Sequence, residues 1–500
     1  MAYRQAKYDE LLIFEMGCIE KQAACFSQEC LDPTMIDKFI PKEIRKKDDI
    51  NIPGLTEVEI ARHYTRLSQM NWGVDSGFYP LGSCTMKYNP KFSEKMASLE
   101  GFALTHPMQP VDMVQGNLEL IYELEKILSV IGGIEAVTLQ PAAGAHGEFT
   151  GLLIARAFHE AKGEERDEVI LPDTAHGTNP ASGAMAGLKV IEIPSEGDGC
   201  VNIEALEAAL SNRTCAFMLT NPNTLGIFER RVREIAEKVH AHGALLYYDG
   251  ANLNAVMGKT TPGKMGFDIV HFNLHKTFGT PHGGGGPGAG PIGVTKELEK
   301  FLPVPRVLKL VKDDGSIKFD LHHKLPYTIG KIHGQLGNFL VLVKAYVYTL
   351  LVGGDGLEKV SEAAVMNSNY LKMKLEHLFP LPYPGLRKHE FVLNGSILKK
   401  KGASTLDAAK WLLDEGIHAP TIYFPQIFHE AIMIEPTETE TIEEMNRFVE
   451  VMKAIAEADA EELRKCPQNT TRKRLDETFA AKNMIFTYRA LRDWRERNAD

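Results

Sequence analysis

The chain has 500 residues, of which 44% are hydrophobic and 24% charged, and its formal net charge is −10. This is the composition of a soluble globular protein, and the length predicts two or three domains. The negative net charge argues against a nucleic-acid-binding protein.

Cysteine usage and hydropathy exclude further classes of protein. None of the seven cysteines forms a CxxC pair, so the sequence predicts neither a disulfide framework nor a metal site. The first residues include acidic side chains and no long apolar run, which argues against a signal peptide. The most apolar segment, Phe339 to Val352, is interrupted by Lys344 and is too short to span a bilayer. We expect a cytoplasmic protein that is not bound to a membrane.

Residues 1 to about 70 predict mixed helix and loop, and the loop GFYPLGSCTMKYNP follows from Gly77 to Pro90. This loop is dense in small hydroxyl and thiol side chains, including Ser83, Cys84 and Thr85. It is either a plain cluster of turns or the lining of a small-molecule pocket, where hydroxyl groups donate hydrogen bonds at close range.

From about residue 110 helices and strands alternate. Gln115 to Ile131 has the periodicity of a helix, and Ala136 to Gln140 that of a strand. The small-residue turn PAAGAHGE then opens an apolar helix. The amides of Ala143, Gly144 and Ala145 at its N-terminus are a candidate anion site. Packing alone also explains many turns of this kind.

Further strands and helices continue the alternation to about residue 250. Elements of this length in this order predict an α/β sandwich with a mainly parallel sheet. The predicted strands are Glu168 to Leu171, Lys189 to Ile193, Ala216 to Thr220 and Ala244 to Tyr248, with helices at Ile203 to Leu210 and Glu229 to His242.

The C-terminal part has a different pattern. Two long helices, one ending at Gly353 and one from Leu357 to Leu378, lead into short strands that alternate with helices. This pattern predicts a smaller α+β domain, and Thr441 with Glu444 resembles a capping box at the start of its last helix. The tail beyond is basic and helical, as in a solvated helix on the surface. We divide the chain into an N-terminal arm (1–95), a large cofactor-binding domain (96–345), a small α+β domain (346–465) and a helical tail (466–500).

Several polar residues fall at the predicted carboxyl ends of strands, where ligands gather in parallel sheets. Asn221 precedes Asp249 by 28 residues (249 − 221), and Asp249 precedes Lys276 by 27 (276 − 249). One helix and one turn fit each gap. His176 follows another strand, and His275 is next to Lys276. We expect these side chains at one edge of the sheet.

Pyridoxal phosphate is a cofactor whose needs this edge meets. Its aldehyde requires a lysine (Lys276), its ring nitrogen a carboxylate (Asp249), and its phosphate the amides at 143–145. We expect Asn221 to hydrogen-bond the phenolic oxygen of the ring and His176 to stack on the ring face. Each residue also has an ordinary structural explanation: Lys276 could extend to water, Asp249 could cap a strand end, and His176 could be a loop histidine. Their coincidence at one edge favours the cofactor site.

The glycine-rich stretch GGGGPGAG after Lys276 is not a dinucleotide-binding motif. It follows a lysine-bearing strand, does not clearly open a helix, and lacks a GxGxxG-to-acid unit. We expect these glycines to permit close approach of backbone, including an approach across a dimer interface.

Seven motifs, taken in order, resemble the glycine decarboxylase P-protein of the glycine cleavage system. The resemblance is greatest to subunit 2 of the two-chain form and extends from about Asn51 onward. One departure is His146, where many longer relatives carry glutamine, so its role stays open. The motifs are YPLGSCTMKYNP, QPAAGAHGE, DTAHGTNPASG, TNPNTLGIFE, YYDGANLNA, FNLHKTFGTPHGGGGPG and MIEPTETET.

The resemblance implies a fold-type I enzyme that uses pyridoxal 5'-phosphate to decarboxylate glycine and transfers the aminomethyl group to the lipoyl arm of H-protein. It assigns Lys276 as the Schiff-base lysine, Asp249 as the partner of the pyridinium nitrogen and His176 as the stacking residue. The hydroxyl-rich loop at Ser83 to Thr85 suits substrate binding. Because single-chain members are much longer, the resemblance also implies a separate subunit 1 and an α2β2 heterotetramer.

Two alternatives stay open. The chain could catalyse another fold-type I reaction on a small amino acid, such as an aldol transfer or a transamination. It could also be a non-catalytic scaffold subunit that has kept the fold, although the presence of Lys276, Asp249 and His176 argues for catalysis.

Overall fold

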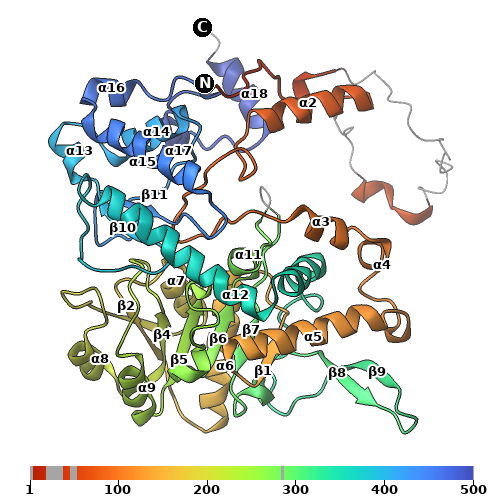
Figure 1. The fold of residues 1–500 in the computed structure, drawn as a ribbon. Coiled ribbons are helices and arrows are strands. Elements are labelled where there is room, and N and C mark those ends of the chain that lie inside the picture. The colour runs from red at the N-terminus through yellow and green to blue at the C-terminus, as the bar shows by residue number, and fades with distance from the viewer. Residues whose placement is uncertain (1–3, 18–37, 46–52, 283–285, 499–500) are drawn as a thin grey trace. The chain divides into compact units, whose positions relative to one another are not determined.

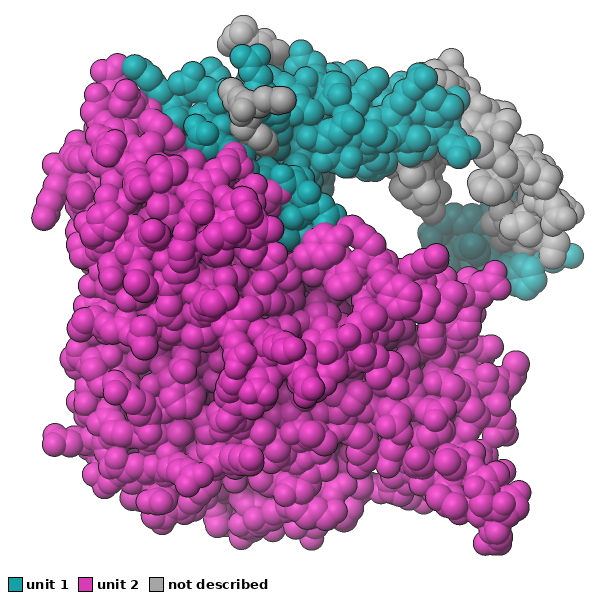
Figure 2. Space-filling view, in the orientation of Figure 1, with its two compact units in different colours: residues 1–76, 413–416, 465–500 teal, residues 77–412, 417–464 magenta. Residues whose placement is uncertain are grey.

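The structure, a computed structural model, describes residues 4–17, 38–45, 53–282 and 286–498. Cys18, Cys25, Cys30 and the glycines 283–285 lie outside the described residues. The chain forms two compact units (Figure 2), one of residues 1–76, 413–416 and 465–500, the other of residues 77–412 and 417–464. The domain boundaries expected at residues 95, 345 and 465 stay a prediction.

The larger unit contains a seven-stranded sheet with the order β1-β7-β6-β5-β4-β2-β3 (Figure 1). Strand β7 is antiparallel to both of its neighbours, and the other pairings are parallel. The predicted α/β class with a mainly parallel sheet is therefore confirmed. The strands are β1 (Ala136–Thr138), β2 (Glu168–Pro172), β3 (Lys189–Ile193), β4 (Thr214–Thr220), β5 (Leu245–Gly250), β6 (Ile269–Phe272) and β7 (Ile292–Val294).

The centre of the sheet is buried on both faces because its central strands place apolar side chains on both sides. In β5, Leu246 and Tyr248 belong to one hydrophobic cluster, whereas Leu245 and Tyr247 belong to another. This is the pattern of a strand covered by helices on both sides. The first cluster takes side chains from α5 (Gln115–Gly132), α9 (Val232–Ala241) and α12 (Phe339–Leu375), and the second from α6 (Gly144–Ala161). Shorter helices of this region are α3 (Lys91–Ala97), α4 (Glu100–Ala103), α7 (Thr178–Met185), α8 (Ile203–Ala209), α10 (Pro262–Met265) and α11 (Leu274–Thr277).

Several element boundaries differ from the expected ones, and two of these differences have a clear local reason. Helix α9 begins at Val232 rather than at Glu229. The N–H of Glu229 donates to Asn221 Oδ1 and its carboxylate accepts from the N–H of Arg231, which fixes this residue in the preceding loop. Strand β5 continues through Asp249, because this residue still pairs with Thr220 of β4 and His271 of β6.

A second, smaller sheet follows α12 in the chain. It is antiparallel, with the order β10 (Phe391–Asn394), β12 (Ala431–Ile434) and β11 (Thr421–Ile422). The apolar side chains of one face pack in a cluster with α13 (Ser396–Lys400), α14 (Thr405–Asp414) and α15 (Ile442–Glu457), whereas Val392 and Met433 on the other face pack with Leu225 and Ile227. Helix α15 starts as predicted, with the side chain of Thr441 accepting from the N–H of Glu444. A hairpin of β8 (Arg306–Val311) and β9 (Ile317–His322) had not been predicted.

Helix α12 is long and apolar enough, by length and composition, to cross a membrane. It is not a regular helix over its whole length, because Gly353 has φ 68° and ψ 175°. Val341, Leu342 and Val343 are buried in the hydrophobic clusters of the larger unit. The apolar half before Gly353 is therefore a core helix.

The smaller unit combines both ends of the chain. Its helices are α2 (Glu57–Gln69), α17 (Glu477–Lys482) and α18 (Tyr488–Arg497). The ring of Phe14 stacks on Tyr488 with 5.1 Å between centroids, and Arg495 forms an ion pair with Glu15. The basic tail is thus helical, as predicted, and packs against N-terminal residues.

Replacing Leu124 by alanine should lower the apparent free energy of unfolding by about 2–5 kcal/mol, because the side chain is fully buried under the sheet and its loss leaves a cavity. Urea unfolding followed by circular dichroism measures this change. Leu104, which is 75% exposed, is the control, and its alanine variant should unfold like the unaltered protein.

Candidate active site

Lys276 lies on the one-turn helix α11, just after β6. Asn273 begins this helix, and Leu274, expected at the end of the strand, lies inside the helix instead. The Nζ atom of Lys276 donates a hydrogen bond to the carbonyl oxygen of Ser83, at 3.1 Å. Because Leu274 and Thr277 are buried, the helix is fixed while the lysine side chain stays partly exposed. The amine is held at a defined place but is still accessible.

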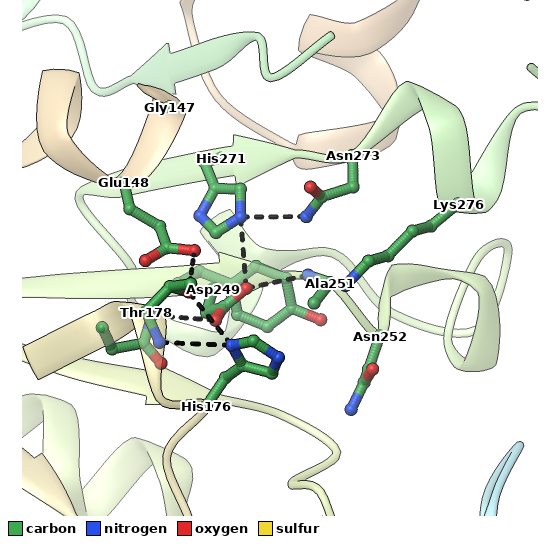
Figure 3. Close-up of polar contacts among 12 residues, drawn as sticks. Gly147, Glu148, His176, Thr178, Asp249, Ala251, Asn252, His271, Asn273 and Lys276 are labelled. Atoms are coloured by element: carbon green, nitrogen blue, oxygen red, sulfur yellow. Dashed lines mark hydrogen bonds and ion pairs between the residues drawn. The ribbon is translucent and has the colours of Figure 1, made fainter. Parts of the chain in front are cut away.

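Asp249 lies in the neighbouring strand β5 and is 1% exposed (Figure 3). Its Oδ2 accepts from Asn179 Nδ2 at 3.0 Å, and its Oδ1 accepts from the N–H of Ala251 at 2.9 Å. The ring of His271 approaches to 3.2 Å. Burial alone would raise the pKa of Asp249, but His271, the charge of Lys276 and these hydrogen bonds hold it below its usual value. The result is a buried carboxylate that stays ionised.

His176 lies in the turn after β2, on the same side of the sheet as Asp249 (Figure 3). Its Nδ1 is 3.0 Å from the hydroxyl of Thr178, which donates in turn to Glu148 Oε1 at 2.8 Å. Burial, followed by the charge of Lys276, lowers the pKa of the imidazole. A flat, neutral ring is thus fixed in orientation beside the carboxylate.

Glu148 is the second buried acid of this region. It lies in α6, just after the first turn, and accepts hydrogen bonds from Thr178 and Ser182. Burial and then the charge of Asp249 raise the pKa of Glu148 to about 7. Asp249 is therefore ionised at a lower pH than Glu148.

Asn221 does not join this group. Its Oδ1 accepts from the N–H of Glu229 at 2.9 Å and its Nδ2 faces the carbonyl of the same residue, so the amide serves a loop. The reason is the alternation of a strand: Thr220 is the register neighbour of Asp249, and the next side chain points to the opposite face. The structure shows the Asn221 amide engaged with the backbone of Glu229, and the expectation that it binds a ring oxygen stays a prediction.

The N-terminus of α6 has the features expected of an anion site. Ala143 is its N-cap residue, with no side chain to cap the helix, and Gly144 and Ala145 begin its first turn. A Cβ at Gly144 would collide with Asn273 Oδ1, and one at Gly147 would lie 2.6 Å from the carbonyl oxygen of Gly290. Glycine is thus required for the helix end to approach the segment that carries Lys276.

His275 is 6% exposed and does not face Asp249. Its Nδ1 lies 3.2 Å from both the N–H and the carbonyl oxygen of Ala289, and its ring is 4.4 Å from that of His282. Burial, followed by the charges of Lys276 and His282, lowers its pKa to about 3, so the ring is neutral. These contacts link Ala289 to α11, and the expectation that His275 contacts the cofactor stays a prediction.

The hydroxyl-rich loop lies on the other side of Lys276. Ser83 contacts the lysine through its carbonyl oxygen, and Thr85 donates to Glu435 Oε1 at 2.5 Å. Cys84 is partly buried, and burial raises the pKa of its thiol. The loop therefore does adjoin the candidate lysine, as its composition had indicated.

Three contributors were missed in the sequence. Asn179 and Thr178 lie within the motif DTAHGTNPASG, shortly after His176. Their closeness to His176 in the sequence could have indicated that they belong to the same site. His271 lies inside an apolar strand, and only its register with Asp249 reveals it.

Three buried hydroxyl groups near this edge have no hydrogen-bond partner within the described part of the chain: those of Thr220, Thr277 and Thr280. Native proteins rarely leave such groups unsatisfied, so they fit a site that holds a polar ligand. A lysine, an ionised carboxylate, a flat ring and an open helix N-terminus are also the set that pyridoxal phosphate requires. The fold and the site define a fold-type I pyridoxal-phosphate-dependent enzyme.

Comparison with known proteins identifies the family. Residues 24–321 match the model of the glycine cleavage system P-protein, and residues 360–478 match a glycine dehydrogenase C-terminal domain. The chain belongs to the glycine cleavage system P-protein family.

Two relatives are similar over nearly their whole length. A probable glycine dehydrogenase (decarboxylating) subunit 2 of Pyrococcus abyssi is 53% identical, over 99% of both chains. One of the same name from Kosmotoga olearia is 54% identical, over 94% of this chain and 98% of its own. Among solved structures, a glycine decarboxylase (P-protein) in inhibitor-bound form superposes with a TM-score of 0.72 at 21% identity, covering 86% of this chain and all of its own. At that identity the superposition shows the fold alone.

Stability should fall as the pH rises through about 7, because Glu148 must ionise in a buried place. The pKa of Glu148 in the folded protein is about 7, above the usual 4.5. The protonated carboxyl group therefore contributes its full stabilisation below pH 4.5, and this contribution is lost above about pH 7. Replacing Glu148 by glutamine should remove on the order of 3 kcal/mol of this dependence, measured by urea unfolding across pH. Glu160 on the same helix is the control; its side chain is 63% exposed, and its glutamine variant should keep the full dependence.

Proposed function

We propose that the chain is the lysine-bearing catalytic subunit of a two-subunit P-protein. It decarboxylates glycine and transfers the aminomethyl group to the lipoyl arm of H-protein, releasing CO2. Membership of the P-protein family carries this proposal, together with Lys276 on α11 and the ionised Asp249 in the adjacent strand.

Each residue has a defined task in this proposal. Pyridoxal phosphate, when bound, supplies an electron-accepting ring for the pair of electrons that departing CO2 leaves behind. Lys276 would bind its aldehyde, and Asp249 would keep a proton on its ring nitrogen. The ring of His176 would limit its tilt, and the amides of Ala143, Gly144 and Ala145 would hold its phosphate.

Asn221 takes a supporting task instead. By binding the backbone of Glu229 it shapes the loop after β4, next to the unpartnered hydroxyl of Thr220. Ser83 to Thr85 would line the substrate side, because Ser83 already contacts Lys276.

The partners follow from the names of the relatives, which are called subunit 2. We propose a separate subunit 1, an α2β2 heterotetramer and a lipoylated H-protein as acceptor. We also propose that the enzyme is cytoplasmic. Size-exclusion chromatography with light scattering, on this chain alone and mixed with subunit 1, tests the assembly.

Replacing Lys276 by arginine should abolish exchange of labelled CO2 with the carboxyl group of glycine and the visible absorbance of bound cofactor. Arginine keeps the charge but cannot bind an aldehyde in the same way. The exchange is measured with lipoylated H-protein and subunit 1 present. An unaltered protein that binds the cofactor but exchanges no CO2 would exclude glycine decarboxylation and favour another reaction of this fold. A protein that binds no cofactor would favour a scaffold.

Asp249 and Asn221 should differ in the kind of defect they produce. Asp249→Asn should lower the exchange rate by about 10²–10³-fold, since a preorganised charge is lost. Asn221→Ala should cost about 1–3 kcal/mol of stability, because the N–H of Glu229 loses its partner, with a smaller effect on rate. Urea unfolding and exchange rates, measured on both variants, separate the two roles. Equal loss of rate in both would contradict the assignment.

A further inference from the structure

A second group of buried acids lies around the loop that contacts Lys276. In the segment from Ser83 to Lys87, every second residue contacts one of these acids. The N–H of Ser83 donates to Glu390 Oε2 at 2.6 Å, and the hydroxyl of Thr85 donates to Glu435 Oε1 at 2.5 Å. Lys87 Nζ donates to Glu438 Oε1 at 2.7 Å. No task in the proposed reaction explains these glutamates.

The register of the small sheet explains why two of the acids are adjacent. Phe391 of β10 pairs with Ile434 of β12 in antiparallel register. Glu390 comes directly before Phe391 and Glu435 directly after Ile434, so the two glutamates lie side by side. Their carboxylate oxygens and a ring nitrogen of His389 lie within 4.8 Å of one another, and all three residues are at most 1% exposed.

The cations near this pair are few. Lys87 is engaged with Glu438, so its charge is already balanced. Lys276 is linked to the pair through one residue: its Nζ donates to the carbonyl of Ser83, whose own N–H donates to Glu390. The thiol of Cys84 faces the same cluster from the loop.

The cluster contains unpartnered atoms that a purely structural arrangement would not leave. Both ring nitrogens of His389 and the Oε2 of Glu435 have no hydrogen-bond partner within the described ranges. His389 Nε2 stands 3.6 Å from Glu390 Oε1, just beyond a hydrogen bond. Ser83, whose N–H donates to Glu390, and Thr437, two residues after Glu435, have φ near +60°, a strained conformation outside glycine.

Electrostatics favour retention of protons here. Burial, and then the charge of Glu435, raise the pKa of Glu390 well above its usual range. Burial raises the pKa of Glu435 to about 7, against the charges of Lys276 and Lys87. Burial also lowers the pKa of His389 to about 3, so this ring stays neutral.

We propose that Glu390 and Glu435 are positioning residues for Lys276 that share one proton while its amine is charged and gain a second when the amine loses its charge. The proton that leaves Nζ is the one that the pair acquires. The buried cluster thus stays neutral in both states, which avoids the large cost of an uncompensated charge away from water. The inference rests on the proposed function, in which the amine of Lys276 changes its charge in each turnover.

Infrared spectroscopy of the full-length chain tests the shared proton without any assay of activity. At about pH 8.5, above the pKa of the acids that titrate near 7, the unaltered protein should show the C=O stretch of a protonated carboxyl group. Glu390→Gln should remove this band. Glu440→Gln, which alters a less buried glutamate of the same segment with a pKa of about 7, should keep it. Absence of the band in the unaltered protein would overturn the proposal.

The coupling to Lys276 is tested by the reciprocal change. Lys276→Met removes the charge, so the carboxyl band should persist to a pH higher by about one unit or more, a tenfold change in proton affinity. Lys259→Met, which removes a surface lysine paired with Glu358 and Glu362, should leave the titration unchanged. If Lys276→Met and the unaltered protein titrate identically, the coupling is refuted. It is also refuted if the unaltered chain retains a divalent cation after dialysis and the Glu390→Gln variant does not.

The exchange of labelled CO2 with glycine gives a separate readout. In Glu390→Gln and Glu435→Gln it should fall by about 10²-fold, with a flatter dependence on pH than in the unaltered protein. Normal rates and pH profiles in both variants would defeat the inference. No exchange in the unaltered protein would instead defeat the proposed function, while the infrared titration would still decide whether the proton is shared.

Discussion

The charge of Asp249, buried in the middle of an apolar sheet, is the constraint on which the rest of the site depends. An ionised carboxylate away from water is costly unless donors and cations surround it. Asn179, the N–H of Ala251 and Lys276 stabilise it here. Asn179 comes from α7, Ala251 from the turn after β5 and Lys276 from α11, so the fold must bring these three segments together before the charge can be kept.

Lys276 stands between two groups of acids that differ in origin. Asp249 and Glu148 come from the large sheet and its covering helix, whereas Glu390 and Glu435 come from the ends of the small sheet. The charge of Lys276 favours the ionised form of all four carboxyl groups. A single amine is thus the shared counter-charge of both groups. This explains why a change in its charge would be felt across the site. The loop from Ser83 to Lys87 in turn connects the acids of the small sheet to α11.

Local sequence was sufficient for much of the large sheet. The strand from Lys189 to Ile193 and the helix from Ile442 to Glu457 have the predicted bounds, because apolar periodicity and a capping threonine act within a few residues. The hairpin of β8 and β9 was missed. The signal was available in β9, where Ile317, Phe319 and Leu321 alternate with Lys318, Asp320 and His322, the pattern of a half-buried strand.

Residue types and spacing alone identified Lys276, Asp249 and His176 as candidates, since strand ends of a parallel sheet share one edge and motif order points to one family. They could not reveal that Asn221 faces a loop, because successive side chains of a strand point to opposite faces of the sheet. Nor could they bring Glu390 beside Glu435, which are 45 residues apart (435 − 390) and adjacent only through the register of β10 with β12. Pairing of distant strands depends on the packed core, and no short window of sequence contains that information.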